Sequence, residues 1–420
     1  MLKIIYPVCC GIDVHKKFVV ATIATTDKNN VTTYQTRKFS TFTDDLLQLE
    51  KWLKENNCKY VCMESTGKYW IPIFNVLENS CKVTLANPKF VRNIPGKKTD
   101  KKDSLWLADL HKHGLVPGSF IPPPQIRQLR DLVRYRQKLI NFKTSEKNRF
   151  QNSLTVSNVM ISNVVSDTFG KSASSIIKHL IDNPDCQDFD FTSMLHGSMK
   201  HKAEDIAKSI NGKISKYQAQ KMNICLQHLD DINSLISKLE SSIYELAIPF
   251  FNEVNIISSM PGIKNFSAIC IISEIGTDMS VFHSSKHLCS WAGLTPQNNE
   301  SAGKKKSVII SHVGAYIKPL LVQCVNAAVR DKKFPYFRLR YETIKKRRGH
   351  KRAIIAIARM MLTCIYHMLS KKEFFNFALY ETKLPYKPKS LNSNLSIDEA
   401  ILLLKQHGYD VKPISEAIDS

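Results

Sequence analysis

The first hundred residues contain short apolar runs separated by polar turns, a pattern typical of β-strands that alternate with helices. Strands are expected at residues 8–13, 18–24, 31–36, 60–64 and 82–86. Helices are expected at residues 43–56, around Val76 and Leu77, and at residues 97–108. Three strands in succession followed by α/β units predict a mixed sheet covered by helices, in the α/β class.

After Pro122-Pro123-Pro124 the pattern becomes helical, so the chain is expected to be α/β plus all-α. Apolar residues from Met222 to Leu246 recur in alternating steps of three and four, which predicts a long coiled-coil helix without revealing whether its partner belongs to the same chain. Met260-Pro261-Gly262-Ile263 lies between two apolar helices, as in a helix-hairpin-helix element or an ordinary pair of packed helices. We therefore expect domains at 1–124, 125–250 (helical, coiled coil) and 251–375 (mostly helical), with a polar tail at 376–420.

The net charge of +23 changes the picture most, because an excess this large implies a polyanionic partner. Nucleic acid is the first candidate and an anionic membrane surface the second. No run of about 18 uninterrupted apolar residues exists, so no membrane span is expected. The N-terminus lacks a secretory pattern, and a cytoplasmic location is expected.

Four acidic residues stand where a metal site could form. Asp100 and Asp103 are three residues apart, so a helix presents both on one face. Asp13 and Glu64 each end a predicted strand, and strand ends of such sheets converge on a crevice. Four carboxylates could hold one or two Mg²⁺ ions for phosphoryl transfer. The alternative is that Asp100 and Asp103 are solvated acids at a helix N-terminus.

Basic residues recur in runs that could be solvated faces or phosphate contacts, and the bulk charge favours contacts. Ser301 lies in the same polar loop as the run Lys304-Lys305-Lys306. The composition of this loop alone indicates an ordinary loop serine. The candidate nucleic-acid contacts are Lys97, Lys98, Lys101, Lys102, Arg127, Arg130, Arg134, Gly262, Lys264, Lys304, Lys305, Lys306, Arg347 and Arg348.

Several motifs together resemble the DEDD transposases of bacterial insertion sequences, the IS one-ten class, over roughly residues 8–370. In the first half they are Gly11-Ile12-Asp13, Met63-Glu64-Ser65-Thr66-Gly67, Asn87-Pro88 and Lys98-Thr99-Asp100-Lys101-Lys102-Asp103. In the second half they are Met260-Pro261-Gly262-Ile263, Ala292-Gly293-Leu294-Thr295-Pro296, Glu300-Ser301-Ala302-Gly303-Lys304 and His312-Val313-Gly314.

The resemblance implies a RuvC-like, RNase H-type first domain in which Asp13, Glu64, Asp100 and Asp103 bind Mg²⁺. Ser301 matches the family's catalytic serine, which forms a phosphoserine link to the cut DNA strand. The implied partners are donor and target DNA, a structured bridge RNA as guide, and further copies of the chain, with dimers assembling to tetramers that combine the acids of one subunit with the serine of another. The implied location is the bacterial cytoplasm, at the nucleoid when active.

The chain departs from the family pattern at a few positions. Ala302, Ser307 and Ala315 stand where the family often has Gly, Gly and Asn, which affects the loop geometry more than the nucleophile. Ser104 replaces a common alanine and is expected on a helix surface. Two other functions stay open: a RuvC-like endonuclease that uses water, and a non-catalytic nucleic-acid-binding protein.

Overall fold

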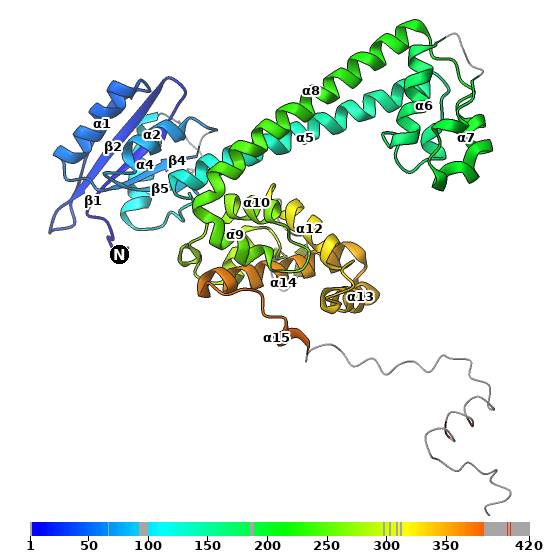
Figure 1. The fold of residues 1–420 in the computed structure, drawn as a ribbon. Coiled ribbons are helices and arrows are strands. Elements are labelled where there is room, and N and C mark those ends of the chain that lie inside the picture. The colour runs from blue at the N-terminus through cyan, green and yellow to red at the C-terminus, as the bar shows by residue number, and fades with distance from the viewer. Residues whose placement is uncertain are drawn as a thin grey trace, which may run out of the picture. The chain divides into compact units, whose positions relative to one another are not determined.

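A computed structural model describes residues 2–65, 67–91, 100–184, 189–296, 299–301, 304–307, 310, 313–381, 401 and 404. The chain divides into two compact units, Met1–Pro122 and Pro123–Ser420 (Figure 1). The first contains a sheet with helices, and the described residues of the second form helices and one hairpin. The expected mixed α/β class is confirmed.

The first unit is built on a five-stranded sheet of order β3-β2-β1-β4-β5. β1 pairs antiparallel with β2 and parallel with β4, and β4 pairs parallel with β5. The strands are β1 (Val8–Val14), β2 (Phe18–Thr26), β3 (Thr32–Ser40), β4 (Tyr60–Glu64) and β5 (Lys82–Ala86). The helices are α1 (Thr43–Glu55), α2 (Trp70–Leu77), α3 (Pro88–Val91) and α4 (Asp100–Lys112).

The two faces of this sheet carry different helices. Ile12, Met63 and other apolar side chains of one face form the main core with Leu49 and Trp52 of α1 and with α2. Helix α4 covers the other face, where its Leu107 packs against Cys62 of β4. Because strand side chains alternate between faces, Asp13 is on the α4 side.

Gly11 allows α4 to lie directly on β1. A Cβ atom at Gly11 would come 2.2 Å from the Ser104 carbonyl oxygen and 2.4 Å from the Ala108 nitrogen. Ser104 is fully buried here, and its hydroxyl lies 2.7 Å from that of Thr22 on β2. The expectation of a surface position for Ser104 is wrong, because the small residues of α4 face the sheet.

Gly11→Ala is expected to destabilise the first unit by about 1–3 kcal/mol, because backbone atoms of α4 must move away from the added methyl group. Chemical denaturation of the full chain measures this change. Gly118→Ala is the matched control, since a Cβ there meets only Thr84 Cγ2 at 3.5 Å, an ordinary contact. Equal stability of the two variants would contradict the close packing of α4.

The second unit begins with two long helices that lie side by side, α5 (Pro124–Val156) and α8 (Lys216–Ala247) (Figure 1). The apolar stripe predicted from Met222 onward is largely buried, and Ile232 and Ile236 pack against Leu139 of α5. The partner helix left open by the sequence is therefore α5 of the same chain. We call this pair the stalk.

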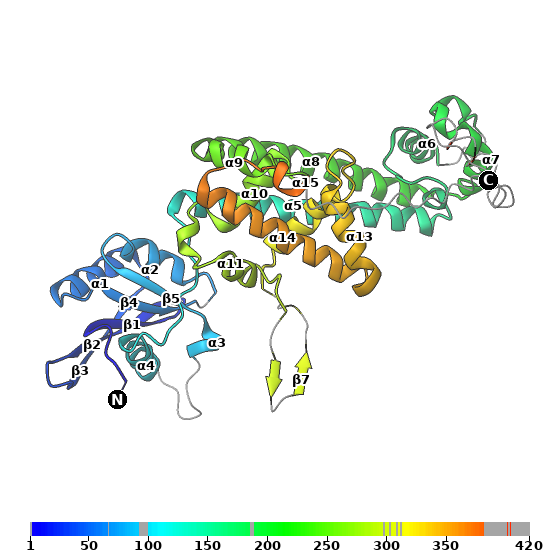
Figure 2. The ribbon, with the colours of Figure 1, turned by 90° about the horizontal axis from the view of Figure 1, so that it is seen from below.

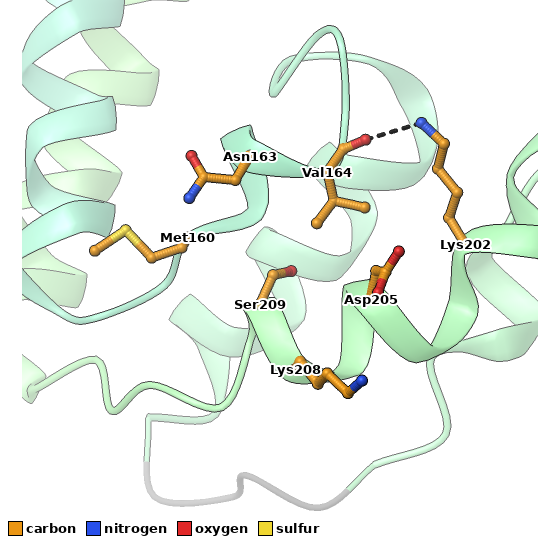
Figure 3. Close-up of a pocket in the computed structure, with 7 residues that line it drawn as sticks. All are labelled: Met160, Asn163, Val164, Lys202, Asp205, Lys208 and Ser209. Atoms are coloured by element: carbon orange, nitrogen blue, oxygen red, sulfur yellow. Dashed lines mark hydrogen bonds between the residues drawn. The ribbon is translucent and has the colours of Figure 1, made fainter.

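A small lobe, residues 157–215, joins the distal ends of the stalk, and its apolar core includes Phe150 and Leu154 of α5 and Met222 of α8. It contains α6 (Lys171–Asp182), α7 (Ala203–Ser209) and the 3₁₀ turns η1 (Ile161–Asn163), η2 (Thr192–Met194) and η3 (Gly197–Lys202). A polar surface pocket of about 450 Å³ lies in this lobe (Figure 3). Lys202 lines it and donates a hydrogen bond from Nζ to the Val164 carbonyl oxygen at 3.0 Å, so this lysine serves the lobe's own packing.

The rest of the second unit is a group of packed helices with one hairpin. Its helices are η4 (Ile248–Phe250), α9 (Phe251–Ser258), α10 (Asn265–Ile275), η5 (Met279–Val281), α11 (Ser285–Trp291), α12 (Ile317–Ala328), α13 (Tyr336–Arg348), α14 (His350–Lys371) and α15 (Ala378–Glu381). The hairpin strands are β6 (Asn299–Ser301) and β7 (Lys304–Ser307). Among the described residues, α14 alone is long and apolar enough to cross a membrane, and half of its apolar window is buried, as in a core helix.

Candidate active site

Asp13 lies at the end of the central strand β1, between β2 and β4. It is 8% exposed and points toward the first turn of α4. His15 Nε2 lies 3.1 Å from Asp13 Oδ2 and 3.4 Å from Asp100 Oδ1. The ligand atoms of these three residues all lie within 4.8 Å of one another. The strand end and the helix N-terminus thus bring together two carboxylates that are distant in sequence.

Burial raises the pKa of the Asp13 carboxyl above its ordinary value. The nearby His15 side chain lowers this pKa, whereas the charges of Asp103 and Asp100 raise it. The charges of Asp103 and Asp100 therefore both act on the Asp13 carboxyl group. Three acidic groups around one partly buried point repel each other, and a divalent cation would relieve that repulsion.

Glu64 ends β4 on the same face of the sheet. The last paired residues of β1 and β4 are Ile12 and Met63, so the next step of this parallel register places Glu64 beside Asp13. Cys62, two residues earlier, faces α4, and the alternation gives Glu64 the same direction. All four acids predicted from the sequence therefore belong to one face and one edge of the sheet.

These donors fit a divalent metal ion, because carboxylate oxygens are its ordinary ligands in phosphoryl-transfer sites. His15, which was not among the acids predicted from the sequence, also lies within this group. A side chain two residues beyond Asp13 on an extended segment shares its face, so the spacing itself was a usable signal.

Ser301 lies in the second unit, as the last residue of β6. β6 and β7 form an antiparallel hairpin in which Ser301 pairs with Lys304 and Glu300 with Lys305, with an irregular register at Asn299. A bridge between Pro296 and Ile310 closes the hairpin at its base. Figure 2 shows the hairpin projecting from the helices of its own unit. Ser301 is thus the last residue of β6, and Lys304, Lys305 and Lys306 follow on the returning strand β7.

Comparison with known protein families gives one match in each half of the chain. A family model of IS110-type DEDD transposases matches residues 10–158, and the model described as "Transposase IS116/IS110/IS902 family" matches residues 254–342. The first covers β1, β4 and α4, and the second covers the hairpin. The chain belongs to the IS110 family of transposases.

Curated relatives agree with this family. The transposase for insertion sequence element IS1111A of Coxiella burnetii is 29% identical over 28% of this chain and 33% of its own length. The pilin gene-inverting proteins of Moraxella lacunata and Moraxella bovis are 23% and 22% identical over 88% and 83% of this chain. These alignments span 98% and 93% of the two Moraxella proteins. This transposase is accordingly an enzyme of the DNA transposase and recombinase class.

Two arginines predicted to contact nucleic acid are engaged within the transposase itself. Arg134 Nε and Nη2 donate to the two carboxylate oxygens of Glu274, each at 2.8 Å. Arg130 donates to the carbonyl oxygens of Ser273 and Glu274 at 2.8 and 2.7 Å, and burial lowers its pKa to about 10. Both side chains hold α5 against the C-terminal end of α10, so their placement does not support nucleic-acid contact.

Gly262, also predicted to contact nucleic acid, has a packing role. Its φ of +85° favours glycine, and a Cβ there would lie 2.5 Å from the Cys324 carbonyl oxygen on α12. The turn between α9 and α10 therefore packs on α12.

The remaining cations fall into three groups. Exposed residues are Lys101 and Lys102 on α4, Lys264 before α10, and Arg347 and Arg348 at the end of α13. Arg127 is partly buried on α5. Lys97 and Lys98 lie outside the described residues.

Proposed function

We propose that this transposase cuts and rejoins DNA strands with a metal site on its first unit and a serine nucleophile on its second. The grouping of Asp13, His15 and Asp100 at the edge of the sheet carries the proposal. The net charge of the protein is +23, so its basic surface is suited to bind nucleic acid. The acidic cluster would bind the metal ion that acts on the bound phosphate. The strand order supports a RuvC-like, RNase H-type assignment of this unit.

Asp13, Glu64, Asp100 and Asp103 would hold one or two Mg²⁺ ions. The bound metal would polarise a DNA phosphate and stabilise the leaving oxygen. Burial of Asp13 keeps its carboxylate less hydrated and therefore available as a ligand. His15 would orient Asp13 and Asp100 toward the common point.

A pocket beside the acids is suited to a neighbouring phosphate of the strand. It has a volume of about 400 Å³, and its lining includes Lys38, Asp100 and Lys101. Lys38 lies over the Phe18 ring with Nζ 3.6 Å from the ring centroid. We propose that Lys38 and Lys101 position the DNA backbone, so that only the phosphate to be cut reaches the carboxylates.

Ser301 would attack that phosphate. Its Oγ bonds to phosphorus, the bond from phosphorus to one sugar oxygen breaks, and the leaving sugar hydroxyl takes the proton lost by the serine. The resulting phosphoserine ester conserves the phosphodiester energy. Attack by a sugar hydroxyl of another strand reverses these steps and releases the serine, so no nucleotide cofactor is needed.

The same proposal includes a guide RNA and an oligomer. The acids and the serine belong to different units of the chain, which is compatible with a site shared between subunits. A structured RNA would pair with donor and target DNA, and dimers would assemble to tetramers. Exposed cations on both units offer the charge that such partners require.

A strand-cleavage assay tests this function. Supercoiled DNA carrying the ends of the element is incubated with the full chain and Mg²⁺, with and without RNA transcribed from the DNA flanking its gene. We expect cleavage that depends on the RNA and leaves protein covalently attached to DNA. Cleavage without an adduct would favour the water-using endonuclease, and binding without cleavage would favour the non-catalytic protein.

A further inference from the structure

A groove of about 1140 Å³ runs along α14 in the second unit. Ile355 and Met360 of α14 form part of its floor, together with Leu294 and Pro296 from the segment that leads to the Ser301 hairpin (Figure 2). Its volume exceeds the range of about 300–1,000 Å³ that is typical of small-molecule pockets, and its lining is mainly apolar. The groove therefore suits a long ligand with apolar faces.

Four cations also line the groove: Arg348, Lys351, Arg352 and Arg359. All four are exposed, and none of their side chains forms an ion pair with another residue in the part of the chain that the structure describes. Residues 343–372 contain nine lysines and arginines and no aspartate or glutamate, so neighbours along the chain supply no compensating charge. This excess of positive charge matches a polyanionic ligand.

The apolar floor distinguishes between two forms of nucleic acid. A duplex presents its phosphates outward and keeps its base faces stacked inside, so it would leave this floor uncovered. An unpaired strand exposes its base faces, and proteins that bind such strands combine a cationic groove with surfaces on which the bases stack. Tyr380 of α15 lines the groove and supplies one aromatic ring. The combination of floor and cations therefore favours an unpaired strand.

The lining also favours deoxyribose over ribose. Thr363 Oγ1 donates to the Arg359 carbonyl oxygen at 2.9 Å, and the Tyr380 hydroxyl lies 3.0 Å from Cys364 Sγ. These two hydroxyl groups of the lining are thus already engaged within the protein. A ribose 2′-hydroxyl placed on the apolar floor would lose its hydrogen bonds with water, and this loss costs free energy.

We propose that this groove binds an unpaired segment of DNA, with its bases on the apolar floor and its phosphates against the four cations. Arg352 and Arg359 both lie on α14, separated by about 10 Å at the helical rise, so they would contact different phosphates of one strand. Phosphate contacts of this kind supply affinity without reading the base sequence. The groove would therefore accept unpaired DNA of any sequence.

The position of the groove connects it with the proposed nucleophile. Pro296 and Ile310 line the groove, and the bridge between them closes the base of the Ser301 hairpin. A strand held on α14 would thus lie beside the base of that hairpin, within the same unit of the chain. That this strand is the one to be cut rests on the proposed function, whereas its binding in the groove does not.

Fluorescence anisotropy of a labelled oligothymidylate of about 12 nucleotides tests this binding with the full chain in EDTA, where metal-dependent cleavage does not occur. We expect Arg352→Gln/Arg359→Gln to weaken binding about tenfold. The slope of log affinity against log salt concentration should also fall by about 1.4, because each phosphate contact of a single strand contributes about 0.7. Lys221→Gln/Lys238→Gln is the matched control, since it removes the same charge from two exposed positions on α8 and should bind like the wild type.

A second variant and a cross-link test the floor. Met360→Gln keeps the length of the side chain but makes its end polar, so it should weaken oligothymidylate binding about fivefold and leave duplex binding unchanged. An oligothymidylate that contains 4-thiothymidine is then cross-linked to the wild-type chain by light. Mass spectrometry should find it on the tryptic peptides 353–359 or 360–371 of α14.

Three outcomes would overturn the proposal. Equal weakening by the two double variants would mean that binding follows the net charge and not this groove. Tighter binding of a duplex than of oligothymidylate, lost in the arginine variant, would assign the groove to double-stranded DNA. Tighter binding of oligouridylate, lost in the same variant, would assign it to RNA. Because no strand is cut in these measurements, failure of the proposed metal or serine mechanism would leave their results unchanged.

Discussion

Ser301→Ala should abolish both DNA cleavage and the covalent protein–DNA adduct, with a loss of about 10³-fold or more in the cleavage rate. In the proposed mechanism the Ser301 oxygen bonds to phosphorus, and alanine removes that oxygen, so the phosphoserine ester cannot form at this position. The backbone pairing of Ser301 with Lys304 does not depend on the side chain, so the hairpin should persist. Denaturing gel electrophoresis of labelled DNA measures free and protein-bound products together.

Ser307→Ala provides the matched control. Ser307 is on the opposite strand of the same hairpin, where it pairs with Asn299. The change removes an identical hydroxyl group from the same small structure, and cleavage should continue. If Ser301→Ala still cuts DNA and only the adduct is absent, water is the nucleophile and the serine mechanism fails.

Asp13→Asn should reduce Mg²⁺-dependent cleavage by at least about 100-fold, while DNA binding without metal is retained. An amide is a weaker ligand than a carboxylate, and it also removes one of the charges that draw a cation to the edge of the sheet. The neutral side chain has nearly the same shape, so the fold should survive. Cleavage rates at increasing Mg²⁺ concentration distinguish weaker metal binding from lost catalysis.

Asp109→Asn is the control for charge. Asp109 lies on α4, the helix that carries Asp100 and Asp103, but Lys112 Nζ and the Tyr34 hydroxyl donate to its carboxylate at 2.9 and 2.6 Å. This variant should lower stability slightly and leave the metal dependence unchanged. If Asp13→Asn cleaves DNA at the wild-type rate and with the same Mg²⁺ dependence, the acids are structural.

Local patterns predict most of the first unit because each residue's environment there depends on near neighbours. The alternation in β1 places Ile12 in the core and Asp13 on the opposite face, and the i, i+3 spacing places Asp100 with Asp103. The convergence of these residues was predictable because strand ends in such sheets meet at one edge. The heptad stripe likewise predicted a packed α8, although only the structure identifies α5 as its partner.

The sequence did not predict which residues distant along the chain would pair with one another. Arg130 and Arg134 read as a basic helix face, and nothing near them indicates that Glu274, 140 residues beyond Arg134, lies against that face. The burial of Ser104 and the packing role of Gly11 were not predicted for a similar reason. Both depend on the close approach of α4 to β1, and local patterns do not show which helix covers which face of the sheet. The net charge of the chain favoured a phosphate partner for every arginine. It could not distinguish arginines that contact nucleic acid from arginines that form hydrogen bonds within the protein.

The ion pair at Glu274 also makes the stalk a mechanical arm. It holds α5 at Arg134, and the helix continues from there to Val156 for about 33 Å before the lobe begins. A tilt of about 5° at this ion pair would move the far end of the helix by about 3 Å over that length. Small strains at one buried carboxylate are therefore amplified into displacements as large as a hydrogen bond is long.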